Sequence, residues 1–111
     1  MENEEFRNSQ EPPREATIIA LGVALDVIKS LDRELSVKIS AGIKQLGTRE
    51  TDNLLIKPLK RKLMELSIKQ YRIIFFRAGG TIYVVDVFKK QSRKTPWRII
   101  RRAEKIYKKF E

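Results

Sequence analysis

The sequence predicts a single α+β domain: an N-terminal helical hairpin packs on a small, mainly antiparallel sheet of three to four strands, and a basic C-terminal helix follows. Apolar residues recur every three or four positions over Leu21–Leu46, which is the period of a helix. Two runs rich in aromatic and β-branched residues, Tyr71–Arg77 and Thr81–Phe88, flank an Ala-Gly-Gly turn signal. A length of 111 residues suits one domain.

The N-terminal third is expected to contain an arm, an ambiguous segment and the helices. Residues 1–14 are acidic and polar and include two consecutive prolines, so we expect a flexible arm before a domain over residues 15–111. Glu15–Gly22 could be a short first strand or the first turns of a helix, because periodicity does not separate the two over so few residues. Asp32 is a plausible N-cap within the helical stretch, so two helices fit as well as one long helix. Gly47 suits its C-terminal cap.

The strands are expected after the polar loop that ends near residue 53. Leu54–Leu59 leads into them, and strand alternation then sets two faces apart. One face carries Met64, Leu66 and Ile68, and the other carries Leu63, Glu65, Ser67 and Lys69. The two later runs are nearly apolar on both faces. We therefore expect helices over one side of the sheet and a partly recessed surface on the other.

The last helix is predicted to begin with Thr95 as its N-cap and Pro96 as its first residue. Helical spacing then gives one apolar stripe, which we expect to be buried and which consists of Ile99, Ala103, Ile106 and Phe110. Basic residues occupy the rest of this helix.

Charge is distributed very unevenly along the chain. Residues 57–111 hold 17 Lys/Arg and 4 Asp/Glu, residues 16–56 hold five of each, and residues 1–15 are acidic. Such an excess raises a positive potential for which polyphosphates are the commonest target. The alternative is a solvated surface that confers solubility.

Several classes of chemistry are excluded by composition. The chain has no Cys and no His, so it offers no thiolate, no disulfide and no imidazole base or ligand. Any catalysis must use Lys, Arg, Tyr, Ser, Thr or a carboxylate. The segment before residue 16 does not have the pattern of a signal peptide, and the apolar runs are far shorter than a membrane span. We expect a soluble cytoplasmic protein that offers a metal neither thiolate nor imidazole ligands.

Short motifs in the second half resemble a known family. In chain order they are Lys57-Pro58-Leu59-Lys60, Leu63-Met64-Glu65-Leu66, Tyr71-Arg72-Ile73-Ile74-Phe75, Val87-Phe88-Lys89-Lys90 and Lys94-Thr95-Pro96, followed by a helix with Ile100, Ala103 and Tyr107. Their order and spacing resemble the phage-derived HigB-like branch of the RelE toxin superfamily, over about residues 23–110. The resemblance implies a RelE-like fold.

The resemblance also implies a function. Such proteins are toxins of type II toxin–antitoxin systems: ribosome-dependent endoribonucleases that cut mRNA when a ribose 2′-hydroxyl attacks the adjacent phosphate. It implies no cofactor, and a cognate antitoxin as partner, which we expect to be a small helix-turn-helix protein. The family usually has an arginine after the Glu-Leu pair, where this chain has Ser67. A catalytically degenerate module that binds RNA or antitoxin is therefore the alternative.

By resemblance, Arg72 is a catalytic candidate, because it matches the strand arginine of the family. A guanidinium can bind two phosphate oxygens at once. The alternative role for Arg72 is an ion pair with Glu65 or Asp86. Asp86 itself is interpreted either as a functional carboxylate or as a salt-bridge partner.

The other catalytic candidates are three lysines and a tyrosine. Lys89 and Lys90 stand where the family carries its basic pair, and Lys94 follows closely. Their alternative role is binding to the backbone of ribosomal RNA. Tyr107 could stack on a base of the message, or it could be partly buried against the sheet.

The remaining cations are predicted to bind RNA: Lys57, Lys60, Arg61, Lys62, Arg93, Arg98, Arg101, Arg102, Lys105 and Lys108. Tyr71 and Trp97 are interpreted as core or rim packing. A third hypothesis is a phage structural protein that binds nucleic acid without specificity.

Overall fold

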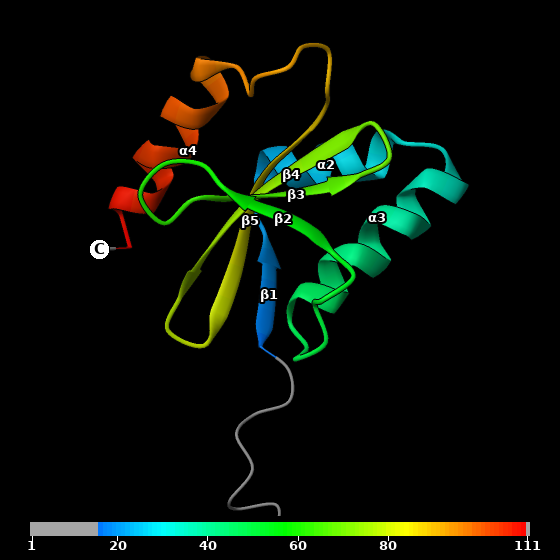
Figure 1. The fold of residues 1–111 in the computed structure, drawn as a ribbon, viewed down its shortest axis with the longest axis horizontal. Helices are drawn as coiled ribbons and strands as arrows, with labels where there is room; N and C mark the ends of the chain where they lie inside the picture. The colour runs from blue at the N-terminus through cyan, green and yellow to red at the C-terminus, as the bar shows by residue number, and fades with distance from the viewer. Residues whose placement is uncertain (1–15, 111) are drawn as a thin grey trace, which may run out of the picture.

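The computed structural model describes residues 16–110 and shows an α+β fold (Figure 1). Its elements, in chain order, are β1 (Thr17–Ala20), α2 (Gly22–Ser30), α3 (Arg33–Leu46), β2 (Leu55–Pro58), β3 (Met64–Ile68), β4 (Tyr71–Ala78), β5 (Thr81–Lys89) and α4 (Trp97–Lys108). The strands form one sheet in the order β1-β5-β4-β3-β2. The predicted arm at residues 1–14 lies outside the described residues.

The sheet has five strands, one more than the upper limit of the sequence prediction. The additional strand is β1, which pairs in parallel with β5, while all the other pairs are antiparallel. Within the ambiguous segment, Thr17–Ala20 therefore forms a strand, and the helix begins only at Gly22. The strand that pairs with β1 begins at Thr81. A contact between distant parts of the chain therefore determines the conformation of β1, and local periodicity could not predict it.

The two-helix alternative is the correct one. The Asp32 carboxylate accepts a hydrogen bond from the Leu35 N–H at 2.9 Å and caps α3, as predicted. Gly47 caps the other end of α3. The Ala16 N–H donates to the Gly47 carbonyl at 2.7 Å, and a Cβ at Gly47 would lie 3.0 Å from the Ala16 carbonyl oxygen. Glycine thus lets the start of β1 pass close to the end of α3.

Strands β4 and β5 form the predicted hairpin, with Gly79 in the left-handed region at φ 62°. The register shifts between Ile74 and Phe75: Ile74 pairs with Asp86, and Phe75 pairs with Val84. One extra β5 residue therefore lies opposite this step, which is a β-bulge.

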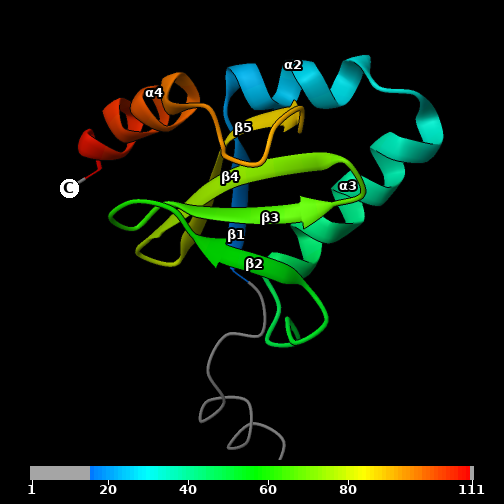
Figure 2. The same ribbon diagram turned by 45° about the horizontal axis from the view of Figure 1, so that its top comes forward.

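Each face of the sheet carries its own core, and different helices cover them (Figure 2). Helices α2 and α3 pack on the face that includes Leu66, Ile73 and Phe75. Helix α4 packs on the opposite face, against Ile74 and Phe76. The alternation predicted for β3 is confirmed, since Met64, Leu66 and Ile68 belong to the first core and Leu63 to the second.

The start of α4 differs from the prediction. The helix begins at Trp97, with Pro96 as an N-cap that makes no side-chain hydrogen bond. Thr95 is not the cap, because its hydroxyl donates to the Glu65 carboxylate on β3 instead. The predicted buried stripe is partly correct: Ala103 is buried and Ile99 and Ile106 are half-buried, whereas Phe110 lies beyond the helix end and is exposed.

Candidate nucleic-acid interface

The face of the sheet beneath α4 carries two polar rows across its central strands. The strand register places Ser67, Arg72 and Phe88 side by side on β3, β4 and β5. The next row consists of Glu65, Ile74 and Asp86. Helix α4 packs over the second row, so the first row lies at the open end of this face.

A hollow of about 340 Å³ opens at that end, between the sheet and the loop that joins β5 to α4. We call it the cationic hollow. Its lining contains five cations and no carboxylate: Arg72, Phe88, Lys89, Lys90, Gln91, Ser92, Lys94, Thr95, Pro96, Arg98 and Ile99. It brings together four of the five predicted catalytic residues, Tyr107 being the exception. A hollow with only positive charge suits a phosphate group.

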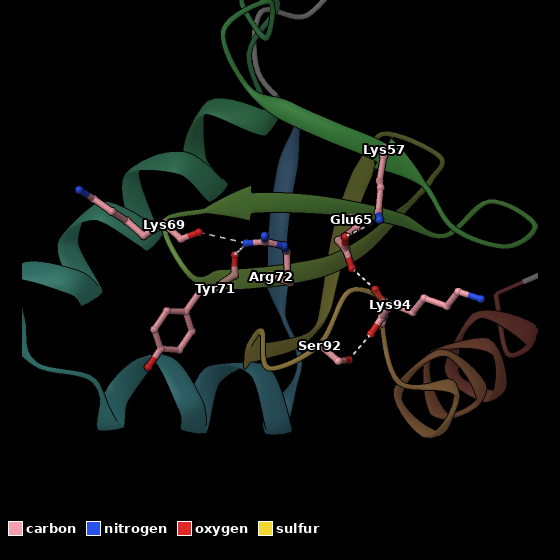
Figure 3. A network of polar contacts seen from close by, with 8 residues as sticks. Lys57, Glu65, Lys69, Tyr71, Arg72, Ser92 and Lys94 are labelled. Atoms are coloured by element: carbon pink, nitrogen blue, oxygen red, sulfur yellow. Dashed lines mark hydrogen bonds and ion pairs between the residues drawn. The ribbon is translucent and has the colours of Figure 1, made fainter.

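The loop that supplies most of this lining is fixed at both ends, and Figure 3 shows the Ser92–Lys94 contact within it. At its start, the Lys90 N–H donates to the Gln70 carbonyl at 2.7 Å. Within it, the Ser92 hydroxyl donates to the Lys94 carbonyl at 2.9 Å. At its end, the Thr95 hydroxyl donates to Glu65. These contacts hold the loop cations beside the sheet.

Glu65 is the anchor of that loop. Its carboxylate is only 2% exposed, and its second oxygen lies 3.5 Å from the Lys57 ammonium. A buried carboxylate is costly unless it is paired and hydrogen-bonded, and Glu65 is both. Strand alternation assigned Glu65 to the correct face, but the pairing with Thr95 joins residues 30 positions apart and had no local signal.

Arg72 is half-buried, and it does not pair with Glu65 or Asp86 among the residues described. Its Nη1 donates to the carbonyl oxygens of Tyr71 at 2.8 Å and Lys69 at 3.1 Å (Figure 3). A guanidinium has five N–H donors, so these two bonds orient the group and leave donors for an anion. The phosphate contact of Arg72 stays a prediction, which its remaining donors would allow.

Asp86 forms an ion pair, which is the second of its two predicted roles. The carboxylate is buried and accepts from the Val87 N–H at 2.9 Å and from Arg102 of α4. Arg102, predicted to bind RNA, therefore ties α4 to β5 while its side chain stays half exposed.

Tyr107 is not brought to the cationic hollow. Its ring packs edge-on against Phe76, with centroids 5.0 Å apart, within the core beneath α4. It lies ten residues after Trp97, which corresponds to roughly 15 Å along the helix. The arrangement observed is the partial burial that the sequence left open as the alternative.

The remaining predicted RNA-binding residues are spread over several surfaces. Lys60 and Arg61 lie 3.7 Å and 3.5 Å from the Glu104 carboxylate, and so connect the β2–β3 loop to α4. Lys62 lines a separate hollow with Arg77. Arg93 is exposed on the loop but does not line the cationic hollow. Exposed positions on α4 are held by Arg98, Arg101, Lys105 and Lys108.

A larger hollow of about 510 Å³ mixes charges of both signs, with Asp32 and Glu34 beside Lys38, Lys69 and Lys89. Its mixed lining suits a phosphate less well. Over residues 16–110, no group of three or more His, Cys, Asp or Glu is arranged to hold a metal ion. No helix in the same range is long and apolar enough to cross a membrane.

Comparisons with known proteins agree with this fold and sequence pattern. Residues 26–108 match the family described as "Phage derived protein Gp49-like (DUF891)", and the chain belongs to that family. This match confirms the phage-derived family that the resemblance indicated, and the solved structures described next confirm a RelE-like fold. No curated protein sequence matches the chain.

Two solved structures are similar in fold. One is a chain of the RelBE2 toxin–antitoxin complex from Mycobacterium tuberculosis, with a TM-score of 0.56 and 17% identity over 68% of this chain and 99% of that chain. The other is a chain of the RelB–RelE antitoxin–toxin complex from Methanococcus jannaschii, with a TM-score of 0.55 and 18% identity over 84% of this chain and 99% of that chain. Identities this low concern the fold alone.

Proposed function

We propose that the protein is the toxin of a type II toxin–antitoxin system and acts as a ribosome-dependent endoribonuclease on mRNA. The observation that carries this proposal is the cationic hollow, where Arg72, Lys90 and Lys94 surround a space without a carboxylate. Membership of the Gp49-like family and the fold of the RelBE complexes support it. The site would act in the cytoplasm, where ribosomes are.

The proposed reaction needs three contributions from the site. The 2′-oxygen loses its proton and bonds to the adjacent phosphorus, the bond from phosphorus to the 5′-oxygen breaks, and that oxygen gains a proton. The products are a 2′,3′-cyclic phosphate and a 5′-hydroxyl end. Arg72 would bind the non-bridging oxygens, where charge develops in the transition state. The lysine amines of the hollow would move the two protons, since its lining has no imidazole or carboxylate.

The ribosome would supply the geometry that the protein lacks alone. The lining of the hollow has no imidazole or carboxylate, and no described metal-ligand cluster adjoins it. Holding the 2′-oxygen in line with the phosphorus lowers the barrier by several kcal/mol, because the entropy of alignment is already lost. The exposed cations on the loop and on α4 would bind ribosomal RNA.

A cognate antitoxin is the second proposed partner, and its contact would be electrostatic. Residues 57–111 carry 17 Lys/Arg against 4 Asp/Glu, so an acidic segment of a small helix-turn-helix protein would neutralise this surface. Affinity for the antitoxin should then fall between low and moderate salt. An affinity that does not respond to salt contradicts the electrostatic contact.

Induction in a bacterium that lacks the antitoxin tests the proposal. We expect growth arrest and a fall in amino-acid incorporation, with mRNA cuts visible by primer extension. Normal growth with soluble protein accumulating would favour the alternative of a degenerate binding module. Ser67 is the specific observation behind that alternative, since it pairs directly with Arg72 in the sheet and supplies no charge there.

A further inference from the structure

Trp97 is the first residue of α4, and its side chain lies outside both cores. The residue is 67% exposed, although its sequence context was interpreted as core or rim packing. It belongs to neither of the two apolar clusters that hold the sheet and helices together. It is also the single tryptophan of the chain. An exposed indole therefore needs an explanation other than folding.

Cations surround this indole. A hollow of about 350 Å³ is lined by Trp97, Arg98, Arg101, Arg102 and Lys105. The Arg101 guanidinium lies 5.9 Å from the centre of the Trp97 ring, which is within the range of a cation–π contact. These residues share one side of α4 because they follow helical spacing. We call this group the Trp97 shelf.

The Trp97 shelf adjoins the cationic hollow. Arg98 lines both, and Pro96, which lines the cationic hollow, immediately precedes Trp97. A chain that occupies one hollow can therefore continue into the other past Arg98. Its ligand would combine repeated negative charge with a flat aromatic group.

We infer that Trp97 is a stacking platform for an unpaired base of single-stranded RNA, whose backbone runs past Arg98 into the cationic hollow. This inference rests on the proposed function only for the identity of the ligand. Single-stranded RNA presents both required groups, since every base has a π-face and every nucleotide a phosphate. The bases of a duplex are stacked inside it. An acidic peptide would neutralise the arginines but has no aromatic group to stack on the indole.

The single tryptophan makes the contact directly observable. Wild-type protein is titrated with a hexamer of 2′-O-methyladenosine, which cannot be cleaved because its 2′-oxygen is blocked. The comparison ligands are an abasic hexamer with the same phosphates and a hexaglutamate peptide. We expect saturable quenching of Trp97 fluorescence by the adenosine hexamer and binding roughly tenfold weaker for the abasic hexamer. Equal affinity and quenching with all three ligands would overturn the inference in favour of charge alone.

Variants at Trp97 supply the second measurement, with a fluorescein-labelled hexamer followed by anisotropy. Trp97→Leu keeps an apolar side chain but has no π-face, so we expect adenosine-hexamer affinity to fall roughly tenfold and abasic affinity to stay unchanged. Trp97→Phe should stay within about threefold of wild type. Val37→Ala, at an exposed apolar residue of α3, is the matched control and should bind as wild type.

Two outcomes decide the inference independently of catalysis. If Trp97→Leu is folded by circular dichroism and binds the adenosine hexamer like wild type, Trp97 is not a platform. If the hexamer binds through Trp97 but mRNA is never cut on ribosomes, the platform stands and the proposed function fails.

Discussion

The two faces of the sheet are built from the same strands but bury different chemistry. Beneath α2 and α3 the buried core is entirely apolar and includes Leu66, Ile73 and Phe75. Beneath α4 two carboxylates, Glu65 and Asp86, are buried together with the apolar residues, and each is paired with a cation. The first face therefore contributes mainly to stability, whereas the second also holds charged groups in fixed positions. A site for an anion is expected on the second face.

The largest effect should come from breaking the apolar face. Phe75→Ala removes a side chain that is 1% exposed and leaves a cavity, so we expect a loss of about 3–5 kcal/mol in the free energy of unfolding. Urea denaturation followed by circular dichroism measures it. Leu55→Ala, at a residue that is 72% exposed, is the control and should change stability by less than about 0.5 kcal/mol. Similar losses for both variants would show that burial of Phe75 in the apolar face does not provide the stability assigned to it.

Breaking the charged face should affect rate rather than folding. Arg72→Ala and Lys90→Ala each remove one cation from the proposed transition state, where a lost donor costs about 3 kcal/mol, or roughly a hundredfold in rate. Ribosome binding should stay within about threefold. Single-turnover cleavage beside a ribosome pelleting titration measures both quantities. If ribosome binding and cleavage fall by the same factor, the two residues bind the ribosome and have no catalytic role.

The loop anchor should give an intermediate effect. Thr95→Val removes the hydroxyl that Glu65 accepts from, and leaving a buried carboxylate short of a hydrogen bond costs about 1–3 kcal/mol of stability. Since the loop carries Lys90 and Lys94, cleavage should also slow. Thr95→Ser keeps the hydroxyl and is the matched control. Equal melting temperatures for the two variants argue against the anchor.

The smallest effect should come from single docking cations. Lys108→Ala should weaken ribosome binding modestly and lower its salt dependence by about one unit of slope, with turnover preserved at saturation. Lys60→Ala should change the slope less, because Glu104 lies 3.7 Å from the Lys60 ammonium and already offsets its charge. Ribosome pelleting at several salt concentrations distinguishes the two. Identical slopes for both variants would show that the Glu104 pair does not matter.

The sequence predicted the elements whose signal is local. Alternation along β3 assigned Leu66 and Glu65 to opposite faces correctly, and the Asp32 cap separated the two helices. The strand at Thr17–Ala20 was left undecided, because its hydrogen-bonding partner is β5, some sixty residues later. The β-bulge beside Ile74 was also missed, since an extra residue leaves no periodic pattern.

The candidate site was predicted in part for the same reason. Arg72, Lys89 and Lys90 became candidates through the family resemblance, and all three line the cationic hollow. The roles of the two aromatic residues of α4 were not predicted, because the direction of each side chain depends on how the helix is rotated against the sheet. Tyr107 is half-buried against Phe76, whereas Trp97 is exposed.

The most direct test of the account is cleavage of a defined mRNA by purified protein with and without ribosomes. We expect cuts only when ribosomes are present, unchanged by a chelator, with a 2′,3′-cyclic phosphate and a 5′-hydroxyl at the new ends. Equal cleavage of naked and ribosome-bound mRNA, loss of cleavage on chelation, or a 5′-phosphate end would contradict it.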